Sequence, residues 1–256
     1  MVKIPSSVLS VPVIYYRGDR RAKERNGRWN LDNGQQFRVG DAANMNWKLL
    51  VGPGVTINTS KVAVSEFGRQ LKECGVTVKT NYLGLVQLAS DSEADLKTTL
   101  KGLVTGVEDD RIPNLVVLLL KSKSIAVYSN FKYLTDKVFC LNSICITEGK
   151  LNDKHGNLKS GTDLQQHMAN VAMKANLKMS GVNHTAQGVN RWLHDTFVIG
   201  ADVTHPGSGA IEHCPSIVGV VGSMDDDGGR FRGILRMQKK QEVSHATLVV
   251  GNEIQV

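Results

Sequence analysis

The feature that most constrains this fold is the segment LVVLLL at residues 115–120, which has no polar side chain on either face. Successive side chains of a strand point to opposite faces, so this segment predicts a strand buried on both sides. Strand-like and helix-like segments alternate around it between residues 46 and 195. The alternation predicts an α/β domain with a central parallel sheet and helices on both of its faces.

Hydrophobic periodicity locates further elements of this block. It predicts a helix over residues 60–73 that ends before Gly75, and a second helix that begins after Ser92. Residues 47–52 and 76–79 are expected as strands. Ligands of such sheets usually bind beyond the carboxyl ends of the strands, which is where we expect a site.

The two flanking blocks have different patterns. Residues 1–45 are basic, with turn signals and no clear periodicity, and we interpret them as a solvated connecting arm. An arm lying along a phosphate backbone or against another domain is the alternative. Residues 196–256 contain three strand-like runs in close succession (197–202, 216–224 and 230–238), which predicts a second domain beginning near Thr196. Three strands would leave a sheet face uncovered, so we expect this block to be part of a larger domain.

Composition narrows the class of protein. A chain of 256 residues suits one large or two modest domains, and its net charge of +7 favours polyanionic partners. No apolar run reaches the length of a membrane span, and the first residues lack the apolar core of a signal peptide. The four cysteines form no Cys-x-x-Cys pair, which indicates a reducing compartment rather than zinc or disulfides. We therefore expect a cytoplasmic protein, with the nucleus as the alternative, and no membrane partner.

Two lysine pairs follow the central strand. Tyr128 and Lys132 are four residues apart, so they share one face if this segment is helical. Lys174 and Lys178 have the same spacing, on a helix expected to begin with a capping box at Thr162. Such pairs are consistent with a pocket for a terminal phosphate with a stackable ring, but also with a solvated helix face.

A second candidate site is centred on Asp202. This carboxylate ends the apolar run FVIGAD and precedes a Thr-His-Pro turn, which suits a ligand of a hard cation such as Mg²⁺. Glu242 follows the third strand-like run and would approach Asp202 if the strands fold back. A turn or cap residue is the alternative for Asp202. The run of aspartates at residues 225–227 is expected to face solvent in a hairpin turn, and His205 is expected to be structural.

The chain resembles the Argonaute family in several joined motifs. Residues 200–206 (GADVTHP) and 215–225 (PSIVGVVGSMD) are similar to the start of the family's Piwi domain. The spacings Tyr128-x-x-x-Lys132 and Lys174-x-x-x-Lys178, the latter followed by Gly-Val-Asn, are similar to its Mid domain, and GRWNL at residues 27–31 resembles the linker that enters Mid. The divergence from animal and plant members points to a filamentous-fungal Argonaute of the quelling type.

This resemblance implies a linker over residues 1–45, a Rossmann-like Mid domain over 46–195 and the N-terminal part of an RNase H-like Piwi domain over 196–256. In Mid, Tyr128 would stack on the first base of a small guide RNA, and Lys132, Lys174 and Lys178 would hold its 5′-phosphate. The backbone at Cys145 would line the same pocket. The loop of Lys121, Ser122, Lys123, Ser124 and Ile125 occupies the place of the family's first-base loop. The family's pocket glutamine is replaced here by Ile144.

In Piwi, the resemblance makes Asp202 the first catalytic aspartate and metal ligand, and Glu242 the mobile glutamate. The complete site would use Mg²⁺ or Mn²⁺ to cleave a target RNA, but its other carboxylates would lie beyond residue 256, so the segment is expected to be inactive alone. Binding in Mid would need no metal. The remainder of Piwi would be a further partner.

Three functions remain open at this stage. The first is a module that binds 5′-phosphorylated guide RNA. The second is a metal-dependent endoribonuclease. The third is an α/β scaffold whose basic surface contacts only the nucleic-acid backbone, which would show steep salt dependence without preference for the 5′ end.

Overall fold

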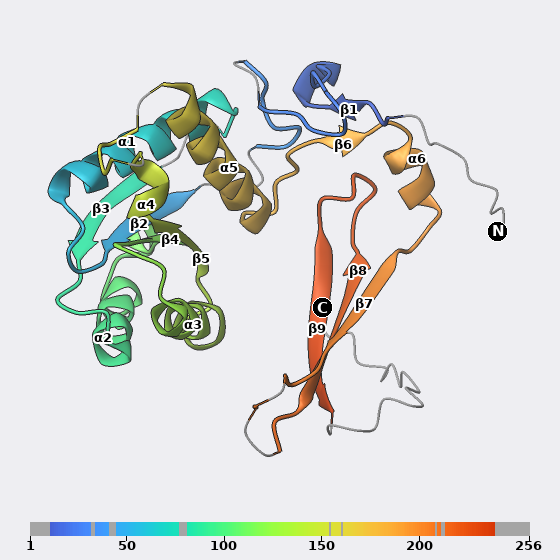
Figure 1. The fold of residues 1–256 in the computed structure, drawn as a ribbon. Coiled ribbons are helices and arrows are strands. Elements are labelled where there is room, and N and C mark those ends of the chain that lie inside the picture. Colours follow the sequence, from blue (N-terminus) through green and yellow to red (C-terminus); the bar gives the residue numbers. More distant parts are fainter. Residues whose placement is uncertain are drawn as a thin grey trace. The chain divides into compact units, whose positions relative to one another are not determined.

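The computed structural model describes residues 11–31, 34–40, 45–76, 81–153, 155–159, 161–207, 209–210 and 213–238. The chain divides into two compact units, residues 1–188 and 189–256 (Figure 1). Each unit is described separately. No helix in the described part of the chain has the length and apolar character needed to cross a bilayer.

The described part of the first unit contains a four-stranded parallel sheet and a separate two-stranded antiparallel pair. The parallel sheet consists of β2 (Asn46–Val51), β3 (Asn81–Gln87), β4 (Leu115–Leu120) and β5 (Asn142–Thr147), in the order β3-β2-β4-β5. The antiparallel pair consists of β1 (Ile14–Tyr15) and β6 (Thr185–Ala186). The helices of this unit are α1 (Ile57–Glu73), α2 (Glu93–Val104), α3 (Ile125–Tyr133), α4 (Glu148–Leu151) and α5 (Thr162–Lys178). The doubly covered parallel sheet expected from the sequence is confirmed.

Two hydrophobic cores lie on opposite faces of this sheet. One packs α1 and α5 against side chains such as Leu49, Val117 and Ile144. The other packs α2 and α3 against the alternate side chains, such as Leu50 and Val116. Figure 1 shows the two helix pairs on either side of the sheet. All six residues of β4 are buried, as a strand between two apolar layers requires.

Local signals explain most of the helix boundaries. Thr56 caps α1, and its hydroxyl accepts from the Thr59 N–H at 3.2 Å. Ser92 caps α2 by accepting from the Asp95 N–H, while the Asp95 carboxylate accepts from the Ser90 N–H at 2.8 Å. The strand expected over residues 76–79 lies largely outside the described residues, and the sequence reading missed β3.

The start of α5 corrects one prediction. The residue that caps this helix is Gly161, and no side chain accepts from the first turn, so the capping box expected at Thr162 does not form. Gly161 has φ 69° and ψ −146°, a conformation that glycine adopts without steric cost. The apolar stripe predicted along α5, from Leu164 to Met179, is buried as expected.

The N-terminal arm is not a solvated connector. Tyr16 and Phe37 are fully buried, and Phe37 belongs to the core beneath α1 and α5. The Phe37 N–H donates to the Cys74 carbonyl at 2.7 Å, and a bridge joins Val39 to Val182. The described part of residues 11–40 is therefore packed as part of the first unit, and the interpretation as a solvated arm is wrong for it.

In its described residues, the second unit is a three-stranded antiparallel meander with one short helix. Its elements are α6 (Val189–His194), β7 (Ile199–Thr204), β8 (Ser216–Ser223) and β9 (Phe231–Gln238). They pair in the order β7-β8-β9, with Asp202 opposite Gly219 and Gly219 opposite Leu235. The three predicted strands are confirmed, with ends that differ by two residues or fewer.

Candidate functional site

The closest grouping of the predicted site residues is at β5, the edge strand of the sheet. Lys132 reaches this strand from α3, and its Nζ donates to the carbonyl oxygen and to the hydroxyl of Ser143, both at 2.7 Å. Lys178 approaches from α5, on the other side of the sheet, and its ammonium acts on Lys132. The contacts of Lys132 are therefore made near the first residues of β5.

The charge state of Lys132 is perturbed by this grouping. Burial lowers the pKa of Lys132 below its ordinary value, and the nearby ammonium of Lys178 lowers it further. The carboxylate of Asp136 acts in the opposite direction. Lys132 is half-buried and Lys178 is exposed. Two ammonium groups held close together favour the binding of an anion, because an anion relieves their repulsion.

A buried hydroxyl network orients Lys132. Ser143 and Thr135 are fully buried, and their hydroxyl oxygens lie 2.8 Å apart. Thr135 lies in a π-helical turn, Leu134–Val138, that follows α3 and brings Asp136 near both hydroxyls. Sequence reasoning missed Ser143 and Thr135, because no local pattern distinguishes these buried hydroxyls from ordinary polar positions.

Tyr128 and Lys132 lie on one face of α3, as their spacing predicted. Tyr128 is 48 % exposed, so that it is accessible to a ligand. On β5, Cys145 lies on the same face as Ser143, and burial raises the pKa of its thiol to about 12, so the thiol is neutral. Ile144 points the other way, into the core of α1 and α5, and is 4 % exposed.

Lys174 has different neighbours. It is exposed on α5, one turn before Lys178. Burial lowers the pKa of His167, and the charges of Lys159, Lys150 and Lys174 lower it further. The structure therefore brings Lys132 and Lys178 together, while Lys174 joins a second basic group along α5.

The predicted first-base loop, Lys121–Ile125, is held at both ends. The ammonium of Lys121 forms an ion pair with Glu148, which directly follows β5. Ser124 caps α3, and its hydroxyl accepts from the Val127 N–H at 3.3 Å. Ile125, the first residue of α3, is 87 % exposed.

Asp202, the centre of the second candidate site, lies on β7 and is exposed. Glu242 lies outside the described residues. Within the described ranges, no three histidine, cysteine or acidic side chains come close enough to hold a metal ion together. Among the residues that the structure describes, Asp202 offers a single carboxylate, which does not by itself fit a divalent cation, and we derive no metal-dependent step from it.

The aspartates of the β8–β9 turn have structural partners. Asp225 accepts from the Gly229 N–H and from Arg230 Nε, both at 3.0 Å, and its side chain is only 11 % exposed. Burial alone would raise the pKa of Asp225, but these hydrogen bonds lower it overall. The expectation that all three aspartates face solvent is wrong for Asp225. His205, expected to be structural, lies 2.9 Å from the Ser216 hydroxyl through its Nδ1.

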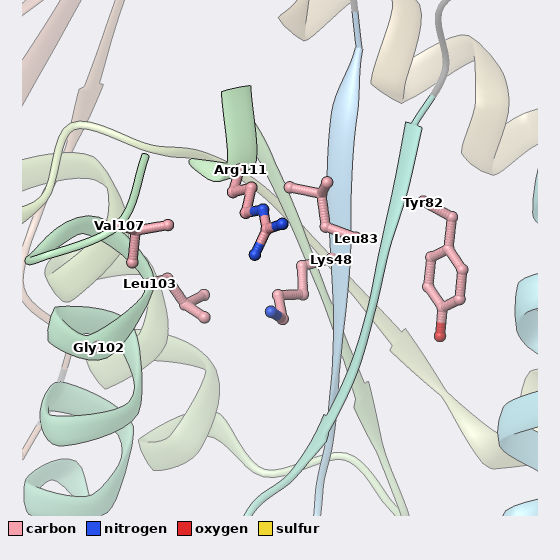
Figure 2. Close-up of a pocket in the computed structure, with 7 residues that line it drawn as sticks. All are labelled: Lys48, Tyr82, Leu83, Gly102, Leu103, Val107 and Arg111. Carbon is pink, nitrogen blue, oxygen red and sulfur yellow. The ribbon is translucent and has the colours of Figure 1, made fainter. Parts of the chain in front are cut away.

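A separate cavity of about 470 Å³ lies between α2 and the β2–β3 side of the sheet. Figure 2 shows the side chains of Lys48 and Arg111 both reaching into the space between α2 and the sheet. Leu83, Leu103 and Val107 supply apolar walls. Arg111 also lies near Glu108, with 3.5 Å between Nε and Oε2. None of the residues predicted to bind a phosphate lines this cavity.

Comparison with known proteins places this geometry in context. The Piwi domain family matches residues 115–251. The chain is 25 % identical to the protein argonaute-2 of Drosophila melanogaster over 242 residues, and 24 % identical to the protein argonaute of Schizosaccharomyces pombe over 252 residues. These alignments cover 93 % and 94 % of the chain, but only 19 % and 28 % of the two relatives. The chain therefore spans less than a third of the length of either relative.

Solved structures share the fold. The MID–PIWI domains of N. crassa QDE-2 match with a TM-score of 0.60 and 25 % identity, over 76 % of this chain and 52 % of that one. The Kluyveromyces polysporus Argonaute with a guide RNA matches with a TM-score of 0.67 and 23 % identity, over 90 % of this chain and 27 % of that one.

Proposed function

Because this chain belongs to the Argonaute family, with a Piwi-domain match over residues 115–251, we propose that it anchors the 5′ end of a small guide RNA in RNA-mediated silencing. The proposed ligand is a 5′-phosphate together with the first base. Target RNA and the remaining part of the Piwi domain are the proposed partners of the whole protein.

The observation that carries this proposal is the approach of Lys132 and Lys178 to each other around β5. The two lysines come from helices on opposite faces of the sheet, and Lys132 is held by two hydrogen bonds to Ser143. A terminal phosphate carries more negative charge than a phosphodiester, so a pair of ammonium groups favours the 5′ end over internal phosphates. Lys174 adds positive charge one turn away on α5.

The exposed ring of Tyr128 supports the same ligand. It lies one turn before Lys132, on the same face of α3, so a base can stack on the ring while the phosphate contacts the ammonium groups. Backbone groups near Cys145 would line the pocket between them. The inward direction of Ile144 means that the site relies on lysines rather than on a polar side chain at this position.

The test is a binding titration of the full chain at fixed ionic strength. Its ligands are the four nucleoside 5′-monophosphates and the corresponding nucleosides, and then one short RNA with a 5′-phosphate or a 5′-hydroxyl. We expect clear preference for the phosphorylated member of each pair. Lys132→Ala and Lys178→Ala should each weaken binding by about tenfold or more, since a charge-assisted hydrogen bond contributes about 1.5–3 kcal/mol.

Lys97→Ala is the matched control, because it removes the same charge from an exposed position on α2. It should leave the preference for 5′-phosphate unchanged. Equal affinity for 5′-phosphate and 5′-hydroxyl RNA, with a steep loss of binding as salt increases, would instead identify a scaffold that contacts only the backbone. Asp202→Asn should have no effect on this binding, with or without Mg²⁺.

A further inference from the structure

A buried carboxylate lies beside the loop that follows β4. Glu148 directly follows β5 and is 4 % exposed, so it is one of the few buried charged residues in the described part of the chain. Lys121, the first residue after β4, forms an ion pair with its Oε2. Since β4 and β5 are parallel neighbours, this pair joins the carboxyl ends of two strands.

The second oxygen of Glu148 is also occupied. The hydroxyl of Thr59, in the first turn of α1, donates to Glu148 Oε1 at 3.0 Å. The hydroxyl oxygen of Thr56, the cap of α1, lies 2.9 Å from that of Thr59. Glu148 therefore links three segments: the start of α1, the end of β5 and the residue that opens the loop. A buried carboxylate with both oxygens bonded has little freedom to move, because each lost partner leaves a charge without compensation.

The far end of the same loop is fixed independently. Ser124 caps α3, and this cap sets where the helix begins. Between the two anchors lie only Ser122 and Lys123, and directly after them Ile125 and Tyr128 expose 87 % and 48 % of their side chains, one helical turn apart. The loop thus places an apolar and an aromatic surface beside its own backbone groups.

We propose that Glu148 is a positioning residue, which sets the selectivity of this chain among nucleotide bases by holding Lys121 and hence the loop Lys121–Ile125. The inference rests on the proposed function, because it assigns the first base of the guide to this loop. Discrimination between bases depends on donors and acceptors placed at fixed points, and a loop anchored at one end only would present them in several arrangements. In this proposal Lys121 pairs with the Glu148 carboxylate and does not bind the phosphate.

The test compares Glu148→Gln, Lys121→Met and the double variant with the unmodified chain. The affinities for the four nucleoside 5′-monophosphates are measured, and the ratio of the highest to the lowest is called the spread among bases. Comparison with the affinities for the matching nucleosides gives the dependence of binding on the phosphate. We expect each single variant to reduce the spread by about twofold to thirtyfold, the range that remote contacts produce, with phosphate dependence retained. The double variant should differ little from either single variant, because all three lack the same ion pair.

Hydrogen exchange provides a readout that does not depend on binding. In Glu148→Gln, amides of residues 122–125 should exchange severalfold faster, whereas amides in α5 should be unchanged. Lys123→Met is the matched control, since it removes a lysine from the same loop without touching Glu148, and it should leave exchange in α1 and at Glu148 unaffected.

The outcomes separate the two proposals. If the unmodified chain binds nucleoside 5′-monophosphates no better than the matching nucleosides, the proposed function is refuted, whatever the variants do. An equal change in affinity for all four nucleotides in Glu148→Gln would show that Glu148 only adjusts the local charge, and would overturn the inference. Unchanged exchange at residues 122–125, or no spread among bases in the unmodified chain, would also overturn it.

Discussion

The ammonium group of Lys132 donates to both oxygen atoms of Ser143, each at a distance of 2.7 Å. Ser143 is fully buried on the edge strand β5, so these two hydrogen bonds attach α3 to the sheet and fix the direction of the lysine. A flexible surface lysine is thereby held in one position beside Lys178, which reduces the conformational entropy lost when an anion binds.

Ser143→Ala should lower both stability and ligand affinity. The substitution removes one acceptor of Lys132 and the hydroxyl beside Thr135, so we expect a loss of about 1–2 kcal/mol in the free energy of unfolding, measured in urea. Nucleotide affinity should fall less than in Lys132→Ala, because the carbonyl oxygen of residue 143 still accepts. Ser65→Ala, at an exposed position of α1, is the control and should be neutral or slightly stabilising.

The pH dependence of binding should reveal the lowered pKa of Lys132. Its ammonium loses its proton at a lower pH than an ordinary lysine, whose pKa is 10.5, and a neutral amine no longer attracts phosphate. Affinity for a nucleoside monophosphate should therefore begin to decline, as pH rises, at a pH below 10.5. Lys132→Arg should shift this decline to higher pH, because arginine stays protonated. Identical pH profiles for the two proteins would contradict the prediction.

The lowered pKa of Lys132 also makes the free energy of unfolding depend on pH. Burial and Lys178 disfavour the charged form of Lys132, so the unfolded chain binds the proton more tightly than the folded chain. Between the lowered folded-state pKa and 10.5, the contribution of this group to stability should become more favourable as pH rises. Chemical denaturation of the unmodified chain and Lys132→Met, compared across this range, measures the contribution as a difference.

Asp225→Asn should destabilise the β8–β9 hairpin. The Asp225 carboxylate accepts from Gly229 and Arg230, and these bonds lower its pKa below the ordinary 3.8. The contribution of the ionised Asp225 carboxylate to the free energy of unfolding is therefore complete above pH 3.8, and it is lost as pH falls through the lowered pKa of the folded state. We expect faster amide exchange in β8 and β9 at neutral pH. Asp226→Asn, at a more exposed carboxylate that pairs with His194, should produce a smaller change.

Gly40→Ala tests whether the N-terminal arm is part of the folded unit. A Cβ atom at Gly40 would lie 2.4 Å from the carbonyl oxygen of Gly75, a backbone atom that cannot rotate away. We expect a loss of about 1–3 kcal/mol in the free energy of unfolding. Gly68→Ala is the opposite control, because a Cβ there meets nothing within 4 Å inside α1 and alanine favours helix by about 1 kcal/mol. Equal stability of the two variants would show that the arm is detached in solution.

Much of the fold could be predicted from local sequence. The fully apolar β4 identified the centre of a parallel sheet, since only a strand covered on both faces can consist of such residues. The spacing of Tyr128 and Lys132 placed them on one helical face, because that relationship depends only on the pitch of the helix. The strands of the second unit were similarly evident from apolar runs bounded by turns.

The contacts that surround the candidate site were less evident from the sequence than its fold. The resemblance aligned Ile144 with the family's pocket glutamine, and the alternation of β5 directs the Ile144 side chain into the core beneath α1 and α5. The burial of Phe37 was missed because a single aromatic in an aperiodic, basic segment gives no sign of the surface that covers it. The predicted capping box at Thr162 does not form, because the helix is capped one residue earlier, at Gly161, which has no side chain to accept a hydrogen bond.

The sequence by itself determined which segments become strands and helices, and which side chains share a helical face, because these depend on interactions between near neighbours in the chain. Only the tertiary structure decided that Lys132 meets Lys178 around β5, that Lys121 pairs with Glu148, and that Ser143 holds Lys132. These contacts join residues on separate elements, and their geometry is set by the order of strands in the sheet and by the two cores that position the helices on it.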